Sequence, residues 1–218
     1  MLHRFENVIF DLDGTLVDTS EGITKSVAYS LDRHGIPYLS VESLKCFIGP
    51  PLKEQFMAFC NKDGDFGTDC VKVYREYYST RGIYECKAYE NVEKLLSDLK
   101  NSGFHVYVAT SKPEKFAKIV LEHTGLLKYF DDVAGANMDN TRTDKAEVLS
   151  YLFDKAGIKD KEKSVMVGDC PHDVVGAKKH VINAIAVSYG FGALKDLEEL
   201  EPLCICKNPD ELFEFLVK

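Results

Sequence analysis

The fold of this chain is decided by the stretch Val8-Ile9-Phe10-Asp11-Leu12-Asp13-Gly14-Thr15-Leu16. Three apolar, strand-forming residues lead into two carboxylates separated by one residue, and a glycine and a threonine follow at once. A short apolar run bounded by turn residues predicts a buried strand. In an open α/β sheet, ligands bind just beyond the carboxyl ends of the strands. Asp11 is therefore expected where a nucleophile or a metal ligand would lie.

The second carboxylate of this stretch, Asp13, lies where the chain leaves the strand and can fold back over the same site. Two neighbouring carboxylates repel each other unless another charge offsets them. A divalent cation with oxygen ligands does so, and Mg²⁺ suits a site in which few carboxylates are supplemented by water and phosphate. The stretch by itself also fits a strand that ends in a solvated acidic turn, so the rest of the chain has to support the metal.

Composition narrows the classes of partner. The chain has 218 residues, a hydrophobic content of 45% and a formal net charge of -8. Its length is enough for one large domain or for one domain with a smaller insertion, and its apolar content supports a sizeable core. An acidic chain argues against a nucleic acid polymer as partner, because that binding needs basic patches. The seven cysteines show no disulfide spacing, which fits a reducing compartment. The sequence has no apolar run long enough to span a membrane, and segment 1–6 does not resemble a signal peptide. We therefore expect a cytoplasmic protein.

Residues 19–86 and the remainder of the chain follow different patterns. Apolar residues at steps of four predict a helix over 19–34, and further helical spacings without strand signals fill 40–82. Beyond residue 91, helical stripes alternate with predicted strands at 104–110, 132–135, 164–169, 184–188 and 203–205. This alternation predicts an α/β fold with a doubly wound parallel sheet. We expect a core of 1–18 and 87–218 and an inserted α-helical cap domain of 19–86.

Three of the predicted strands end in chemically useful side chains, Asp11, Thr110 and Asp169, and a further acid, Asp173, follows four residues after the last of them. The carboxyl ends of parallel strands meet at one edge of a sheet, so these groups are expected to converge. Ser111 is expected to cap a helix that starts after Thr110, with a proline in its first turn.

Several of these motifs carry a resemblance to a known family. The stretch Asp11-Leu12-Asp13-Gly14-Thr15-Leu16 resembles the first motif of the haloacid dehalogenase superfamily, and Gly168-Asp169-Cys170-Pro171-His172-Asp173 resembles its acidic metal motif. Thr110 resembles the hydroxyl motif, and Lys145 matches the lysine that precedes the last motif. The resemblance spans nearly the whole chain and is strongest to the phosphoglycolate phosphatase-like branch, whose helical cap follows the first motif.

The resemblance implies a phosphatase that hydrolyses a small phosphorylated metabolite with the help of Mg²⁺. Asp11 would be the nucleophile that forms an aspartyl phosphate, and Asp13 the general acid and base. The implied catalytic residues are Asp11, Asp13, Thr110 and Lys145. The implied substrate-binding residues are Thr110, Ser111 and Lys145. The implied metal site contains Asp11, Asp169, Asp173 and Asp13, the last through its backbone carbonyl. Lys112 lies near the same edge as Lys145.

Two other functions remain open on the sequence alone. A sugar phosphomutase of the same superfamily would use the same aspartyl phosphate, and its exclusion of water depends on cap closure. A phosphate-binding module without catalysis would have no need for an acid at position 13. In the cap we expect Phe47, Phe56, Tyr74 and Tyr77 to be core and Lys53, Arg75 and Arg81 to be solvated. The sequence is compatible with a monomer or a homodimer.

Overall fold

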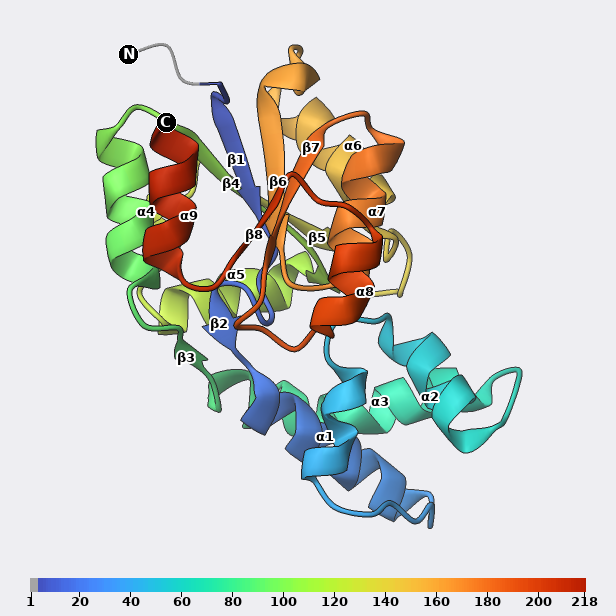
Figure 1. Cartoon of the computed structure of the whole chain (residues 1–218). Helices are drawn as coiled ribbons and strands as arrows, with labels where there is room; N and C mark the ends of the chain where they lie inside the picture. Colours follow the sequence, from blue (N-terminus) through green and yellow to red (C-terminus); the bar gives the residue numbers. More distant parts are fainter. Residues whose placement is uncertain (1–3) are drawn as a thin grey trace.

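The computed structural model describes residues 4–218, and residues 1–3 of the N-terminal segment lie outside the described residues. Figure 1 shows a central sheet with helices on both of its faces and a group of helices below it. The strands of the main sheet are β1 (Asn7–Phe10), β4 (His105–Pro113), β5 (Asp132–Ala136), β6 (Ser164–Gly168), β7 (Asn183–Val187) and β8 (Cys204–Cys206). Their order is β5-β4-β1-β6-β7-β8, and every neighbouring pair is parallel.

β1 lies inside this sheet and all four of its residues are buried. Val8 and Phe10 pack into one apolar cluster and Ile9 into the other, as the alternation of side chains along a strand requires. Asn7 is in register with His105 of β4 and with Ser164 of β6. A strand buried on both faces needs a continuous apolar run, which explains why the Val-Ile-Phe triplet identifies it.

Helices cover both faces of the sheet, which confirms the predicted doubly wound α/β fold. One face is covered by α4 (Val92–Asn101), α5 (Glu114–His123) and α9 (Pro209–Val217). The other is covered by α6 (Lys145–Ala156), α7 (Pro171–Lys179) and α8 (Leu194–Glu199). Short 3-10 turns occur at Leu127–Tyr129 and Lys161–Lys163. Within residues 4–218, we find no helix with the length and apolar character needed to cross a membrane.

Two short strands, β2 (Val17–Asp18) and β3 (Lys87–Ala88), pair antiparallel where the chain leaves and re-enters the sheet region. Between them lie α1 (Ser20–Arg33), α2 (Leu52–Cys60) and α3 (Phe66–Tyr78), with 3-10 turns at Glu42–Phe47 and Gly82–Tyr84. Figure 1 shows these helices below the sheet, at the side away from the C-terminus. The strands are too short for an alternating pattern, so sequence reasoning missed them. The division into core and cap at these points stays a prediction.

The chain around Ser111 differs from the sequence prediction. No helix starts there, because β4 continues to Pro113 and α5 begins at Glu114. The pairing of β4 with β5 shifts register between Thr110 and Pro113, so Ser111 and Lys112 interrupt the regular pairing of the two strands. Proline disfavours helical backbone angles in the residue before it, here Lys112, which explains why the helix begins only after Pro113.

Candidate active site

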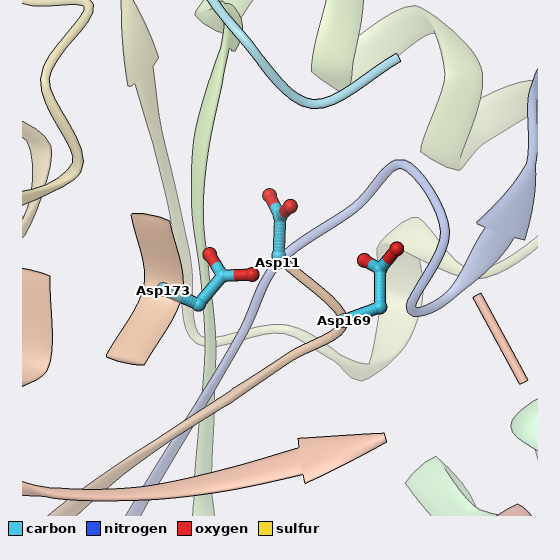
Figure 2. A group of neighbouring side chains, drawn as sticks. All are labelled: Asp11, Asp169 and Asp173. Carbon is cyan, nitrogen blue, oxygen red and sulfur yellow. The ribbon is translucent and has the colours of Figure 1, made fainter. Parts of the chain in front are cut away.

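The strand order brings the predicted site residues together. β1 and β6 are neighbours, and the order of strands along the chain reverses beside β1. Such a switch point leaves a crevice at the carboxyl ends of the strands. Asp11 follows β1 and Asp169 follows β6, while Asp173 lies in the first turn of α7. Figure 2 shows the three carboxylates around one shared space, with Asp11 between the other two in this view.

These three carboxylates form a buried acidic cluster, in which one oxygen of each lies within 4.8 Å of the others. Burial, together with Asp173 and Asp13, raises the pKa of Asp11 to about 6, although Lys145 opposes this. Burial and the charge of Asp11 raise the pKa of Asp169 to about 6. Burial also raises the pKa of Asp173. The ionised cluster is therefore costly in the protein alone, and a nearby positive charge would relieve it.

Lys145 supplies part of that positive charge from the start of α6. Its ammonium nitrogen lies 2.8 Å from Oδ1 of Asp11 and 2.8 Å from Oδ1 of Asp173, and it donates a hydrogen bond to the Ala109 carbonyl at 2.9 Å. Burial alone would lower the pKa of Lys145, but the two carboxylates outweigh burial and raise it. The Asp144 side chain accepts a hydrogen bond from Ala146 N and caps the helix, which fixes the position of the lysine.

Asp169 is held by groups that the sequence analysis did not assign. The Thr15 hydroxyl donates to its Oδ1 at 2.9 Å, and the backbone N–H of Phe191 donates to its Oδ2 at 2.8 Å. Gly190 packs so closely that an added Cβ would lie 2.4 Å from the Asp169 side chain. The glycine at position 190 therefore lets the loop after β7 reach this carboxylate.

Asp13 stands apart from the acidic cluster and has partners of its own. The ammonium of Lys112 donates to its two carboxylate oxygens at 2.5 and 2.7 Å, and the Thr19 hydroxyl donates to Oδ1 at 2.6 Å. Lys112 lies in the irregular part of β4, between Thr110 and Pro113, and is buried. Sequence reasoning noticed the position of Lys112 but gave it no role. The feature of the sequence that could have indicated a role for Lys112 is its place in the polar segment Thr110-Ser111-Lys112, directly after the apolar part of the strand.

A cavity of about 720 Å³, counting the solvent at its mouth, lies between these groups and the helices of 19–86. Asp11, Asp13, Thr110 and Ser111 line it on the sheet side. Thr110 is 1% exposed, and its hydroxyl accepts a hydrogen bond from the backbone N–H of Lys112 at 3.2 Å. Lys145 does not line this cavity but contacts Asp11 from behind it.

Two residues of segment 19–86, Arg75 and Tyr77, differ from the sequence prediction. Arg75 is not solvated: it is half-buried, and its guanidinium donates at 2.7 Å to the carbonyl of Met138 and at 2.7 Å to Asn140 Oδ1. It thus bridges α3 to the loop after β5. Tyr77 is not core, because its hydroxyl donates to Glu85 near the surface. Phe47, Phe56 and Tyr74 are buried as predicted, while Lys53 is half-buried and Arg81 exposed.

The acidic cluster fits a divalent cation with oxygen ligands. Oδ1 of Asp11 and Oδ1 of Asp173 touch the Lys145 ammonium, yet neither takes a well-directed hydrogen bond from any residue in 4–218. Buried carboxylate oxygens in this condition are unusual, because native structures satisfy nearly all of them. Carboxylate oxygens are the ligands that Mg²⁺ prefers. The donor set therefore matches the cation that the sequence predicted.

Comparisons with known proteins agree with this geometry. Residues 8–187 match the family model described as haloacid dehalogenase-like hydrolase. The chain is 39% identical to a 5'-nucleotidase of Pseudomonas aeruginosa, over 94% of this chain and 92% of the relative. It is 37% identical to the tyrosine-protein kinase PtkA of Mycobacterium tuberculosis, over 96% and 72%. The crystal structure of a predicted phosphatase from Clostridium acetobutylicum superposes with a TM-score of 0.94 at 43% identity and covers 97% of each chain. The chain belongs to the haloacid dehalogenase-like hydrolases and is a phosphatase of that family.

Proposed function

We propose that this phosphatase depends on Mg²⁺ and hydrolyses a small phosphomonoester through a phosphoryl group carried on Asp11. One observation carries the proposal: Asp11 is buried and lines the cavity, and the Lys145 ammonium holds its Oδ1 from behind the cavity at 2.8 Å. With Oδ1 held in this way, the other carboxylate oxygen, Oδ2, is the one that attacks phosphorus. A carboxylate nucleophile divides a very slow hydrolysis into two displacements.

In the first displacement, a carboxylate oxygen of Asp11 bonds to phosphorus, the bond from phosphorus to the ester oxygen breaks, and Asp13 gives a proton to that oxygen. In the second, water attacks phosphorus, Asp13 takes a proton from it, and the bond to Asp11 breaks. Lys112 and Thr19 hold the Asp13 carboxylate at the cavity in a fixed position. Such positioning is what acid–base catalysis requires of a side chain.

The remaining residues stabilise charge. We assign the metal to Asp11, Asp169, Asp173 and the backbone carbonyl of Asp13, where bound Mg²⁺ would offset the negative charge of phosphate and carboxylates. Thr110 and Ser111 line the cavity beside Asp11, so they are placed to donate to phosphoryl oxygens. Lys145 holds the nucleophile in position and adds positive charge behind it.

The helices of 19–86 act in this proposal as a cap over the leaving group of a small metabolite. The Pseudomonas relative is named for nucleotides, so nucleoside monophosphates head the substrate panel. Release of free phosphate from these substrates identifies hydrolysis. A mutase would instead isomerise its sugar phosphate, and a protein kinase, the activity for which one relative is named, would transfer the phosphoryl group to a protein. We further propose a cytoplasmic location, which the seven free cysteines support.

Metal dependence is the first expected result. EDTA should abolish phosphate release and Mg²⁺ should restore it, since the ionised cluster needs a compensating charge. Mg²⁺ should also raise the melting temperature by about 5–10 °C at a hundredfold excess over its Kd. Ca²⁺ should support turnover poorly, because its larger coordination shell should misplace the nucleophile. Scanning calorimetry and a phosphate assay measure both effects.

Asp169→Asn and Asp196→Asn form the matched pair for this experiment. Asp169 is completely buried in the cluster, whereas Asp196 is exposed on α8. The first variant should lose the thermal shift with Mg²⁺ and the second should keep it. Full turnover in chelator, or an unchanged shift in Asp169→Asn, would contradict the metal assignment.

A second expected result concerns the cap loop at Gly49, where the backbone has φ +100 and an added Cβ would lie 2.7 Å from Sγ of Cys170 beside the acidic cluster. Gly49→Ala should move this loop and change the ranking of substrates. Displacements of about 1 Å can cost 10²-fold, so kcat/KM should fall by about tenfold or more for the best substrate. Steady-state kinetics over the substrate panel measure the ranking.

Gly64→Ala is the control for backbone strain. Gly64 has φ +71 in an exposed loop of the same region, and an added Cβ meets nothing within 4 Å. Gly64→Ala should lose about 1 kcal/mol of stability, because a side chain disfavours positive φ, and Gly49→Ala should lose at least as much because its Cβ also meets Cys170. Only Gly49→Ala should change the ranking. An unchanged ranking in Gly49→Ala would count against a role of this loop in selectivity.

A further inference from the structure

Arg75, on α3, is a cation in the cavity wall to which the proposed reaction gives no role. Its guanidinium donates to the Met138 carbonyl and to Asn140 Oδ1, each at 2.7 Å. Arg75 and Asn140 both line the cavity, the first from the helices of 19–86 and the second from the loop after β5. The guanidinium therefore lies where these two walls meet, and Arg75 is only half-buried there.

Both partners of Arg75 are neutral oxygens. A guanidinium carries five N–H groups, and those not bonded to Met138 or Asn140 have no acceptor among residues 4–218. Burial lowers the pKa of Arg75, and the only group of the described residues that opposes this is the Tyr74 phenol, not a carboxylate. Because an arginine stays protonated in proteins, Arg75 is a partly desolvated cation with unused donors.

The other charged side chains that line the cavity already have partners. Asp13 binds Lys112, and Asp11 is bound from behind by Lys145. Arg75 is thus the one charge in the cavity wall, among the described residues, without a partner of opposite sign. The chain has 35 acidic residues against 27 basic ones, yet none of the described acids pairs with this guanidinium. A desolvated cation in this condition suits an anion that comes from outside the protein.

Arg75 lies on the side of the cavity that the proposed function assigns to the leaving group. The sheet supplies Asp11 and Thr110 for the phosphoryl group, whereas Arg75 comes from the helices of 19–86. The same helical wall carries the rings of Phe47 and Tyr74. Apolar walls of this kind exclude water, and an ion pair is stronger where the dielectric constant is low.

We propose that Arg75 determines specificity by binding a second anionic group, carried on the leaving group of the phosphomonoester. The class is a small phosphate ester whose leaving group bears a carboxylate or a second phosphate, since both offer the paired oxygens that a guanidinium binds. Such an ester should rank above adenosine 5'-monophosphate, whose leaving group is uncharged at neutral pH. This inference rests on the proposed function, because it assigns the other half of the same substrate.

Pairs of esters with and without the second anion test the inference. Phosphoglycolate and 3-phosphooxypropanoate are each compared with their carboxamide, and propane-1,3-diol bisphosphate is compared with 3-hydroxypropyl phosphate. The wild type should prefer the charged member of a pair by about 10–100-fold in kcat/KM, as hydrogen bonds to a charged group predict. The carboxylate and bisphosphate pairs identify which anion is bound, and the two carboxylates identify its distance from phosphorus. No preference in any pair overturns the inference.

Asn140→Asp is the sharpest variant, because it changes the charge beside Arg75 and keeps the shape. It places a carboxylate where Oδ1 already accepts from the guanidinium at 2.7 Å, and Asp tolerates the φ of +67 at this position. The new carboxylate then occupies Arg75, so kcat/KM for the preferred charged ester should fall about tenfold or more. The neutral member of the pair should be unaffected. A bond that only joined α3 to the loop would become stronger and cost neither ester anything, so equal losses or no loss contradict the role in specificity.

Arg75→Gln should abolish the preference for the charged ester, and the matched control Arg81→Gln, at an exposed position of the same segment, should keep it. Binding without turnover separates the two proposals. The probes are 3-phosphonopropanoate and 4-phosphonobutanoate, in which CH₂ replaces the ester oxygen, and their carboxamides, each titrated by calorimetry into the Mg²⁺-loaded protein. Selective binding that Asn140→Asp removes, without phosphate release from any ester, defeats the proposed function alone. Turnover without preference for a charged ester defeats the role of Arg75 alone.

Discussion

Asp11→Asn protein is expected to release no measurable phosphate from any substrate, a loss of more than about 10⁴-fold. An amide oxygen attacks phosphorus poorly and forms no stable acyl phosphate. The substitution also removes one negative charge from the three carboxylates that lie within 4.8 Å of one another. Both effects act on the same step, so the loss should not depend on the leaving group. Phosphate release from alkyl and aryl esters at high enzyme concentration measures it.

The folded state of Asp11→Asn is the control for this result. Asn is close in size to Asp, and the substitution removes a buried charge. The melting temperature of the variant should therefore be at or above that of the metal-free wild type. The exposed Asp196→Asn should keep full activity. Residual turnover of Asp11→Asn that differs between alkyl and aryl esters would show that another group attacks phosphorus.

The sequence could predict the sheet side of this site because its geometry follows from topology. Parallel strands place their carboxyl ends at one edge, so three apolar runs ending in Asp11, Thr110 and Asp169 had to converge if the strands paired. The helices between β2 and β3 could be predicted in the same way, from helical spacing and the absence of strand signals between 40 and 82. Periodicity and residue order were sufficient for both.

Other parts of the site depend on details that periodicity does not contain. Lys112 reaches Asp13 only because β4 is irregular after Thr110, and an irregularity of one or two residues leaves no pattern. On α3, Tyr77 and Tyr78 both continue the helical stripe set by Tyr74, and the structure buries the second of them. Arg75 resembles a surface residue in sequence but binds a loop more than sixty positions away. Such contacts are decided by packing between segments.

Asp13→Asn is expected to separate the two displacements of the reaction. An alkyl phosphate leaves as a poor alkoxide and needs the proton of Asp13, whereas an activated aryl phosphate leaves as a stable phenolate and hardly needs one. Water attack on the phosphorylated Asp11 needs Asp13 as base in both cases. General acid–base catalysis by a positioned group is typically worth about 10²–10⁴-fold, so the two esters should behave very differently.

With the aryl ester, Asp13→Asn should give a burst of phenolate near one equivalent of enzyme, followed by slow turnover with phosphate retained on Asp11. The alkyl ester should give little burst, because its first displacement is itself impaired. The oxygen of the introduced amide can still accept the hydrogen bonds of Thr19 and Lys112 at the Oδ1 position, whereas its NH₂ group cannot accept the second Lys112 hydrogen bond at the Oδ2 position. Rapid quench followed by mass spectrometry of the peptide that contains Asp11 measures the adduct. Wild-type rates on both esters, or a phosphoryl group on another residue, would refute the roles of Asp11 and Asp13.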